Sequence, residues 1–131
     1  MLSPLEESFI QAIDRAMTLD ELAVTLEALL AGGFAVWPED GSLLETRQLV
    51  AWVRGLRIEI RPREHAPPHF HVCAAELDAS FAIEDGRLLS GSISGRHHAV
   101  VQWWYGHGRK KLVAVWNATR PADCPVGPIH T

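Results

Sequence analysis

The chain has 131 residues, of which 47% are hydrophobic and 21% are charged. This length accommodates about one domain, and the composition excludes an intrinsically disordered protein. No apolar run approaches the roughly 18 residues that a membrane span requires, and the first residues are acidic where a signal peptide is basic. We therefore expect a cytoplasmic protein that does not interact with a membrane.

The formal net charge of −4 is distributed unevenly along the chain. Residues 1–48 hold two basic and nine acidic residues, a balance of −7, whereas residues 49–131 hold ten basic and seven acidic residues, a balance of +3. The C-terminal part is therefore the better candidate for contact with phosphate or with an acidic partner.

Two amphipathic helices are predicted in residues 1–33. Each begins with a capping box, Ser3 to Glu6 in the first and Thr18 to Glu21 in the second, and Gly32 ends the second. The apolar residues at helical spacing are Leu5, Phe9, Ile10, Ile13 and Met17, followed by Leu19, Leu22, Leu26, Leu29 and Leu30. We expect a helical hairpin that either closes the domain or docks a partner chain through its acidic outer face or its leucine stripe.

Residues 34–48 contain turn-forming residues and are interpreted as a connection. From residue 49 the hydrophobic period becomes two, which predicts β-strands. The expected strands are residues 49–54, 56–61, 69–74, 77–83 and 87–90, with hairpin turns near Gly55 and at Asp85-Gly86. Together they predict an antiparallel meander of four to five strands.

Two further helices are predicted after the meander. Ser94 caps the first, which extends to about Tyr105, where Gly106-His107-Gly108 breaks it; the second covers residues 109–119. Trp103 and Trp104 are adjacent and cannot both face inward on an amphipathic helix, so we expect Trp103 or Tyr105 to be exposed.

The fold class that follows is α+β: an antiparallel β-meander packed against C-terminal helices and preceded by an N-terminal helical hairpin. The chain divides into a helical arm (1–33), a connection (34–48), an α+β core (49–119) and an irregular tail (120–131).

The most informative segment for function is His69-Phe70-His71. On a strand, both imidazoles face one side and Phe70 faces the core. Their Cα atoms are then about 6.6 to 6.8 Å apart, close enough for both rings to reach one metal ion. His65, just before two prolines, could supply a third nitrogen. The remaining ligands would come from Glu64, Asp78 or the His97-His98 pair.

Three interpretations of these histidines stay open. They are outward polar residues of a half-exposed strand, or ligands of a divalent metal such as zinc, nickel or manganese, or metal-free groups that contact phosphate or transfer protons. The clustering of histidines, the Pro-Pro pair and the flanking Arg61 and Arg63 favour a site there without selecting one chemistry.

Other catalytic and binding motifs are absent from the sequence. It has no nucleophile elbow, Walker glycine loop, dinucleotide fingerprint or His-Glu-x-x-His, and Cys73 and Cys124 are isolated, which excludes a Cys-x-x-Cys site. The segment from Gly106 to Lys111 resembles an anion-binding loop that leads into a helix, although such a run is also typical of a solvated face.

The histidine segment also resembles a known family. The run Glu-His-x-Pro-Pro-His-Phe-His-Val is followed by Ala-Ser-Phe-x-Ile-Glu-Asp-Gly, by Leu-Leu-x-Gly and by a helix with Leu-x-x-x-Trp. Over about residues 49–119 the chain resembles the bacterial family called domain of unknown function 4160. Members are often encoded beside a small protein of domain of unknown function 2442 and are regarded as candidate toxins of toxin–antitoxin modules. The resemblance implies a cytosolic chain with a small antitoxin-type protein partner, and it supplies no catalytic mechanism.

The leading hypothesis is a toxin component that acts on RNA or on the translation machinery. The reactive groups would be His65, His69 and His71. The phosphate contacts would be Arg57, Arg61 and Arg63. One alternative is a non-enzymatic protein-interaction or metal-binding module, and another is a metal-dependent hydrolase in which the same three histidines bind zinc. Under any of these hypotheses the chain could form a homo-oligomer.

Overall fold

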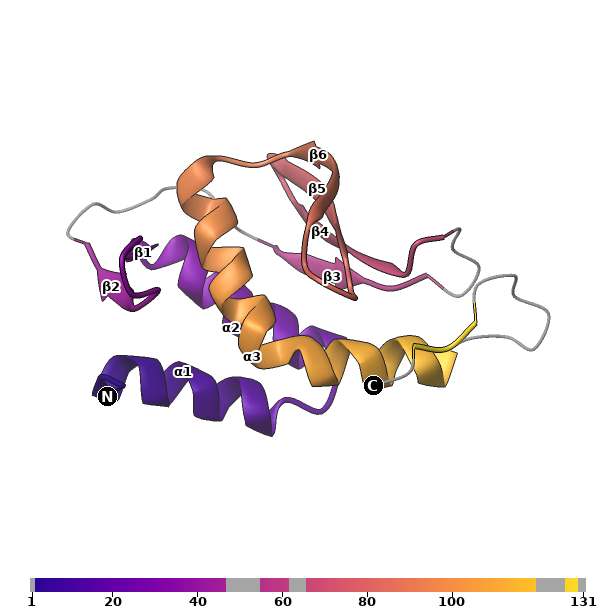
Figure 1. Cartoon of the computed structure of the whole chain (residues 1–131), viewed down its shortest axis with the longest axis horizontal. Coiled ribbons are helices and arrows are strands. Elements are labelled where there is room, and N and C mark those ends of the chain that lie inside the picture. Colours follow the sequence, from indigo (N-terminus) through magenta and orange to yellow (C-terminus); the bar gives the residue numbers. More distant parts are fainter. Residues whose placement is uncertain (1, 47–54, 62–65, 120–126, 130–131) are drawn as a thin grey trace.

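The computed structural model describes residues 2–46, 55–61, 66–119 and 127–129, and the following account concerns those residues. In chain order they form two helices, a two-stranded hairpin, a four-stranded antiparallel sheet and one long helix (Figure 1). This arrangement confirms the predicted α+β class. The strand predicted for residues 49–54 lies outside the described residues.

Both N-terminal helices begin where the capping boxes predict. Helix α1 (Pro4–Arg15) starts after Ser3, whose hydroxyl accepts the backbone N–H of Glu6 at 3.1 Å. Helix α2 (Leu19–Ala31) starts after Thr18, and Gly32 ends it. The prediction for Met17 is wrong: this side chain is 80% exposed, because α1 ends at Arg15 and Met17 lies in the link between the helices.

Residues 34–46, the described part of the predicted connection (34–48), are more regular than predicted. Strands β1 (Phe34–Val36) and β2 (Leu43–Glu45) pair as a short antiparallel hairpin. Arg96 holds this hairpin to the last helix: its guanidinium donates to the Phe34 carbonyl at 3.1 Å and to the Thr46 hydroxyl at 2.6 Å. Three-residue strands are too short to show a two-residue period in the sequence.

The main sheet has the strand order β3-β4-β5-β6, and every neighbouring pair is antiparallel. Its strands are β3 (Arg57–Glu59), β4 (His69–Ala74), β5 (Leu77–Ala82) and β6 (Leu88–Ser92). On the inner face, Phe70 stacks against Phe81 and Tyr105, with ring centroids 5.5 and 6.3 Å away. The side chains that alternate with this inner row form the outer face, where the histidines of β4 lie.

A single helix, α3 (Gly95–Thr119), takes the place of the two predicted C-terminal helices, so the predicted break at Gly106-His107-Gly108 is wrong. Its axis changes direction along its length (Figure 1). Each glycine costs about 1 kcal/mol of helix stability relative to alanine. Burial of Trp104 and Trp116, both 0% exposed, outweighs that cost.

The expectation that Trp103 or Tyr105 is exposed is also wrong, since they are 9% and 7% exposed. The reason is that α3 packs on two sides at once. Its Trp104 and Tyr105 rings meet Phe70 of the sheet, while the helix also contacts α1, α2 and β1. A helix covered on several sides buries residues all round its circumference.

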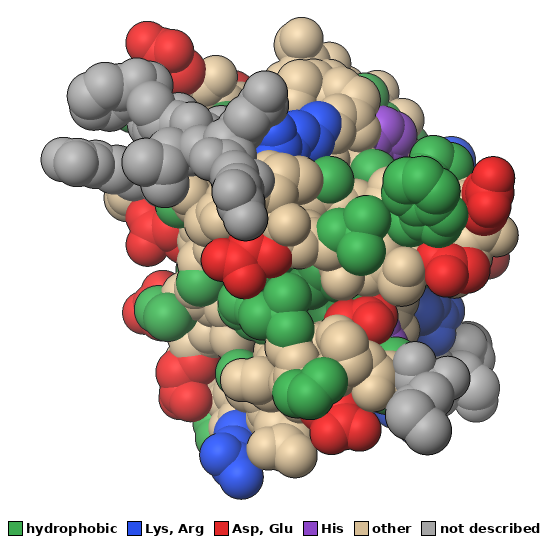
Figure 2. Space-filling model, turned by 90° about the vertical axis from the view of Figure 1, so that its left-hand side faces the viewer, with side chains coloured by type: hydrophobic (Ala, Val, Ile, Leu, Met, Phe, Trp, Pro, Cys, Tyr) green, Lys and Arg blue, Asp and Glu red, His purple; other side chains and the backbone are tan. Residues whose placement is uncertain are grey.

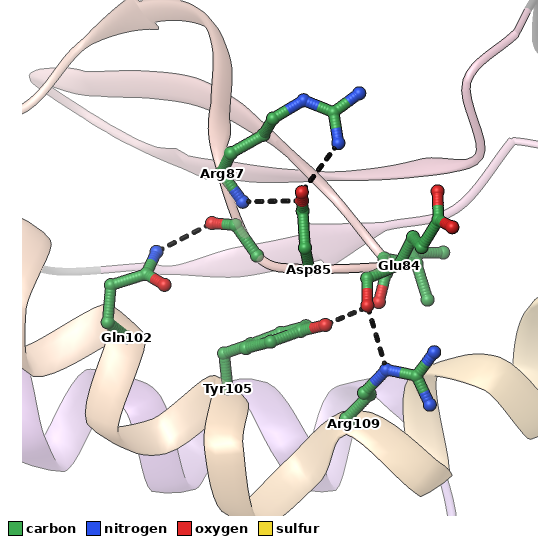
Figure 3. A network of polar contacts seen from close by, with 8 residues as sticks. Glu84, Asp85, Arg87, Gln102, Tyr105 and Arg109 are labelled. Atoms are coloured by element: carbon green, nitrogen blue, oxygen red, sulfur yellow. Dashed lines mark hydrogen bonds and ion pairs between the residues drawn. The ribbon is translucent and has the colours of Figure 1, made fainter.

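Three side chains of α3 fasten the turn between β5 and β6 (Figure 3). Gln102 donates to the Gly86 carbonyl at 2.6 Å, Tyr105 to the Ile83 carbonyl at 2.6 Å and Arg109 to the Glu84 carbonyl at 3.0 Å. Burial raises the pKa of Tyr105, which keeps its hydroxyl a donor at neutral pH. These contacts fix the turn and thereby the position of β6, which lies at one edge of the described sheet.

The described helices and strands share one hydrophobic core, which extends from Ile13 of α1 to Trp116 of α3. The indole N–H of Trp104 donates to the Thr25 hydroxyl of α2 at 2.9 Å inside this core. None of the described helices has the length and apolar character needed to cross a bilayer.

Candidate functional site

The two histidines of β4 open into a hollow on the outer face of the sheet. We call this site the histidine hollow. It has a volume of about 310 Å³, and its walls are Pro67, His69, His71, Ser80, Leu89 and Ser90. The strand period explains the position, since Phe70 between the two histidines is fully buried on the opposite face. The prediction that both imidazoles share one face is confirmed.

His69 is held rigidly in the hollow. The residue is 3% exposed, and its Nδ1 lies 2.8 Å from the carbonyl oxygen of Pro67. A carbonyl oxygen only accepts hydrogen bonds, so Nδ1 carries the hydrogen. When the ring is neutral, Nε2 therefore holds the lone pair, and a backbone contact of this type fixes both the tautomer and the ring orientation.

His71 lies beside His69 and is more accessible. The two ring centroids are 4.8 Å apart and the planes meet at 67°, an edge-to-face contact. His71 is partly exposed and pairs across the sheet with Ser80 on one side and with Glu59 on the other. Two imidazoles at this distance can act on one small group, one as proton acceptor and one as proton donor.

Two serine hydroxyls complete the polar wall. Ser80 Oγ and Ser90 Oγ lie 2.6 Å apart, across the β5–β6 pair, and Ser80 is 5% exposed. One hydroxyl hydrogen is used between them, so the other can point toward a ligand. Neither serine was predicted from the sequence. Their strand register could have indicated them, because residues directly opposite each other on neighbouring strands lie on the same face of the sheet.

Arg57 of β3 and Arg61, which follows that strand, are not independent cations. Glu59 lies between them and accepts Arg57 Nε at 3.3 Å and Arg61 Nη2 at 3.2 Å. The hydrogen bond from Arg57, followed by that from Arg61, lowers the pKa of Glu59, so its carboxylate is charged at neutral pH. Both arginines were predicted from the sequence as phosphate contacts. Glu59 was assigned no functional role, although the two-residue period places it on the same face.

Several residues considered as metal ligands do not reach the hollow. His98 lies on the inner side of the sheet, its ring centroid 5.9 Å from that of Phe81. Asp78 is opposite Cys73, farther along the strands, and its carboxylate is 3.9 Å from the Cys73 thiol. In the part of the chain that the structure describes, no three His, Cys, Asp or Glu side chains come together as a metal site requires. Glu64, His65 and Arg63 lie outside the described residues.

The anion-binding loop suggested for the segment from Gly106 to Lys111 is wrong, because the segment is helical. Two of its charged side chains, Arg109 and Lys111, bind carbonyl groups instead. Arg109 holds the β5–β6 turn, and the Lys111 ammonium donates to the carbonyls of Asp14 and Ala16 at 2.8 and 2.9 Å. Lys111 thereby supplies hydrogen bonds to carbonyl groups at the C-terminal end of α1, which lack partners within the helix.

A family model matches the part of the chain that holds the histidine hollow. Residues 55–117 match the model of the family described as Domain of unknown function (DUF4160). This segment of the chain belongs to the DUF4160 family. It runs from the start of the described sheet to the last turn of α3 and includes the whole histidine hollow, whereas α1, α2 and the β1–β2 hairpin precede it. Searches of curated proteins and of solved structures give no significant match.

Proposed function

We propose that the chain is the toxin component of a bacterial toxin–antitoxin module and that it cleaves RNA in the histidine hollow without a metal ion. The observation that carries the proposal is the pair of imidazoles 4.8 Å apart in a concave site that also holds two serine hydroxyls. The role implies a cytoplasmic location and a small antitoxin-type protein as partner.

The chemistry assigns one task to each side chain. His69, whose Nδ1–H is bound to Pro67, takes the 2′-hydroxyl proton on Nε2. The 2′-oxygen attacks phosphorus, the bond from phosphorus to the 5′-oxygen breaks, and protonated His71 donates a proton to that leaving oxygen. The products are a 2′,3′-cyclic phosphate and a 5′-hydroxyl. A hydroxyl of the Ser80–Ser90 pair donates to a phosphate oxygen as its charge grows.

Arg57 of β3 and Arg61, which follows that strand, guide the phosphate backbone toward the hollow. Their side chains are 66% and 56% exposed, and β3 is hydrogen-bonded to the histidine strand. Arginine contacts of this kind position a nucleic acid without reading its sequence. Glu59 reduces the attraction, and it lies opposite His71.

The test is induced expression of the full chain in a bacterial host, followed by cleavage of single-stranded RNA with purified protein. We expect growth arrest and cleavage by the wild type, neither by a His69→Ala/His71→Ala variant, and both by Cys73→Ser. Cys73 is the matched control, since it follows His71 by two positions on the same strand and face.

A chelator separates the proposal from its alternatives. Cleavage that survives the chelator supports the metal-free mechanism, and cleavage that the chelator abolishes would identify a metal-dependent hydrolase. No arrest and no cleavage by the folded wild type would instead favour a protein-interaction module.

A further inference from the structure

A second concave site lies on the helical side of the molecule, away from the histidine hollow. It has a volume of about 540 Å³ and is enclosed by the start of α1, the turn between β1 and β2 and the middle of α3. We call it the α1–α3 cavity. Its lining includes the side chains of Glu6, Asp40, Trp103 and His107. Figure 2 views the molecule from the β1–β2 side, where acidic side chains surround hydrophobic ones.

Glu6 presents a carboxylate oxygen to this cavity although the residue is only 5% exposed. Its Oε1 accepts the capping-box contacts from Ser3, at 3.3 Å from the hydroxyl and 3.5 Å from the backbone nitrogen. Its Oε2 has no protein partner among the described residues. No fully buried side-chain oxygen lacks a partner in that part of the chain, so Oε2 must be accessible from the cavity.

Asp40 supplies a second carboxylate in the same way. Its Oδ1 accepts both the backbone N–H of Ser42 at 3.0 Å and the Ser42 hydroxyl at 2.7 Å, which leaves Oδ2 as an outward acceptor. These hydrogen bonds lower the pKa of Asp40, and the group is charged at neutral pH. Among the described residues, no lysine or arginine lines the cavity to neutralise the two carboxylates.

The third feature is an aromatic wall. The Trp103 indole and the His107 imidazole lie one helical turn apart on α3, with ring centroids 4.5 Å apart. Trp103 is 9% exposed and borders the cavity with that part of its ring. An indole attracts a cation through its quadrupole, and a planar guanidinium beside it can bind a carboxylate through its N–H groups. The volume falls in the usual range for ligand sites, about 300 to 1,000 Å³.

We propose that the α1–α3 cavity binds a guanidinium group, carried either by a free small molecule or by an arginine side chain of a partner protein. Carboxylates without a neutralising cation disfavour anions, and an aromatic wall beside them favours a flat cation over a compact, strongly hydrated one. The site is separate from the histidine hollow, so the proposal does not depend on RNA cleavage.

The test is a titration of the isotope-labelled full chain with argininamide, observed by NMR at the His107 ring and at the Gly41 and Gly106 amides. Citrullinamide is the matched ligand, because it has nearly the same shape and keeps the α-amino group but carries a neutral urea in place of the guanidinium. We expect saturable shifts with argininamide, at least tenfold weaker binding of citrullinamide, and roughly tenfold weaker argininamide binding by Asp40→Asn. Glu39→Gln, in the same exposed turn but outside the cavity lining, should bind like the wild type.

A second variant protects the result against loss of folding. Glu6→Gln keeps a residue that serves in a capping box, so α1 should stay folded while the cavity loses a charge. Equal affinity for argininamide and citrullinamide, or unchanged affinity in both Asp40→Asn and Glu6→Gln, would overturn the proposal. Tighter binding of agmatine than of an acetylated Gly-Arg-Gly amide assigns a free cation, and the reverse order or equal affinity assigns an arginine side chain.

Discussion

The histidine hollow and the α1–α3 cavity are built in different ways. The hollow is made almost entirely by the sheet: its side chains come from adjacent strands and from Pro67, just before β4. The cavity joins Glu6, Asp40 and His107, which are far apart in sequence and meet only because α1 and the β1–β2 turn both pack near α3. The hollow is flanked by arginines, whereas the cavity is lined by carboxylates. The difference shows that local strand order can encode one site while the other exists only in the assembled fold.

The largest expected effect is the loss of RNA cleavage when a single histidine of the hollow is replaced. We expect His69→Gln and His71→Gln each to lower the rate of RNA cleavage by about 10²- to 10⁴-fold, the usual contribution of a positioned acid or base. The two variants should lose cleavage to a similar extent, because proton removal from the 2′-oxygen and proton donation to the 5′-oxygen belong to one displacement.

Single-turnover cleavage at neutral pH checks this prediction, with Cys73→Ser as control. Burial raises the pKa of the Cys73 thiol, which is therefore protonated at neutral pH, and its replacement should leave the cleavage rate unchanged. Cleavage at the wild-type rate by either histidine variant would contradict the assigned roles. Argininamide binding at the α1–α3 cavity should be the same in all three variants.

Two glycines allow each site to be disturbed alone. Gly91 in β6 has φ +89°, and a Cβ there would lie 2.0 Å from the carbonyl oxygen of Asp78. Gly41, in the cavity lining, has φ +70° with nothing within 4 Å of a Cβ. Both alanine variants strain the backbone, but only Gly91→Ala also creates a clash.

We expect Gly91→Ala to lower the free energy of unfolding by roughly 2 to 4 kcal/mol and Gly41→Ala by about 1 kcal/mol. Urea denaturation of the two variants measures the difference. Gly91→Ala should also displace Ser90 and Leu89 and thus reduce cleavage more than it reduces cation binding. Equal destabilisation by the two substitutions would mean that the close approach of β5 and β6 at Gly91 relaxes without cost.

The sequence predicted the elements whose signals are local. The boundaries of β4 match the prediction of residues 69–74, since proline precedes the strand and the two-residue period is continuous. Ser3 and Thr18 marked both helix starts through their capping boxes. The shared face of His69 and His71 followed from the same period. Glu59 could also have been found, because Arg57, Glu59 and Arg61 alternate along one face.

The features that sequence reasoning missed depend on packing. Gly106 and Gly108 predicted a break in the helix. Burial of the apolar face of α3 stabilises the helix by more than the two glycines destabilise it, so α3 continues through them. The expectation that Trp103 or Tyr105 is exposed was wrong because it assumed a helix with one buried side. The α1–α3 cavity has no sequence signal at all, since Glu6 and Asp40 already serve a helix cap and a turn.

The smallest effect concerns the charge beside the hollow. Replacement of Glu59 by glutamine keeps its shape but removes the carboxylate that holds Arg57 and Arg61. We expect the variant to bind RNA about 3- to 10-fold more tightly, with the larger gain at low salt, because Arg57, whose side chain is 66% exposed, loses the carboxylate that neutralises its charge. Fluorescence polarisation with an RNA that carries a 2′-deoxy substitution at the scissile position measures the affinity without cleavage. Glu45→Gln is the control, an exposed glutamate at the end of β2.

The pH dependence of this gain follows from the charge of Glu59. Its arginine partners lower the pKa of the carboxylate, so the wild type carries the negative charge from about pH 6 to about pH 8 and the gain should be constant there. As the pH falls through this lowered pKa, the wild type loses the charge and the difference between the two proteins should vanish. Equal RNA affinity of the two proteins at neutral pH and low salt would mean that phosphate does not approach β3. The arginines would then serve only to hold Glu59 beside the histidine strand.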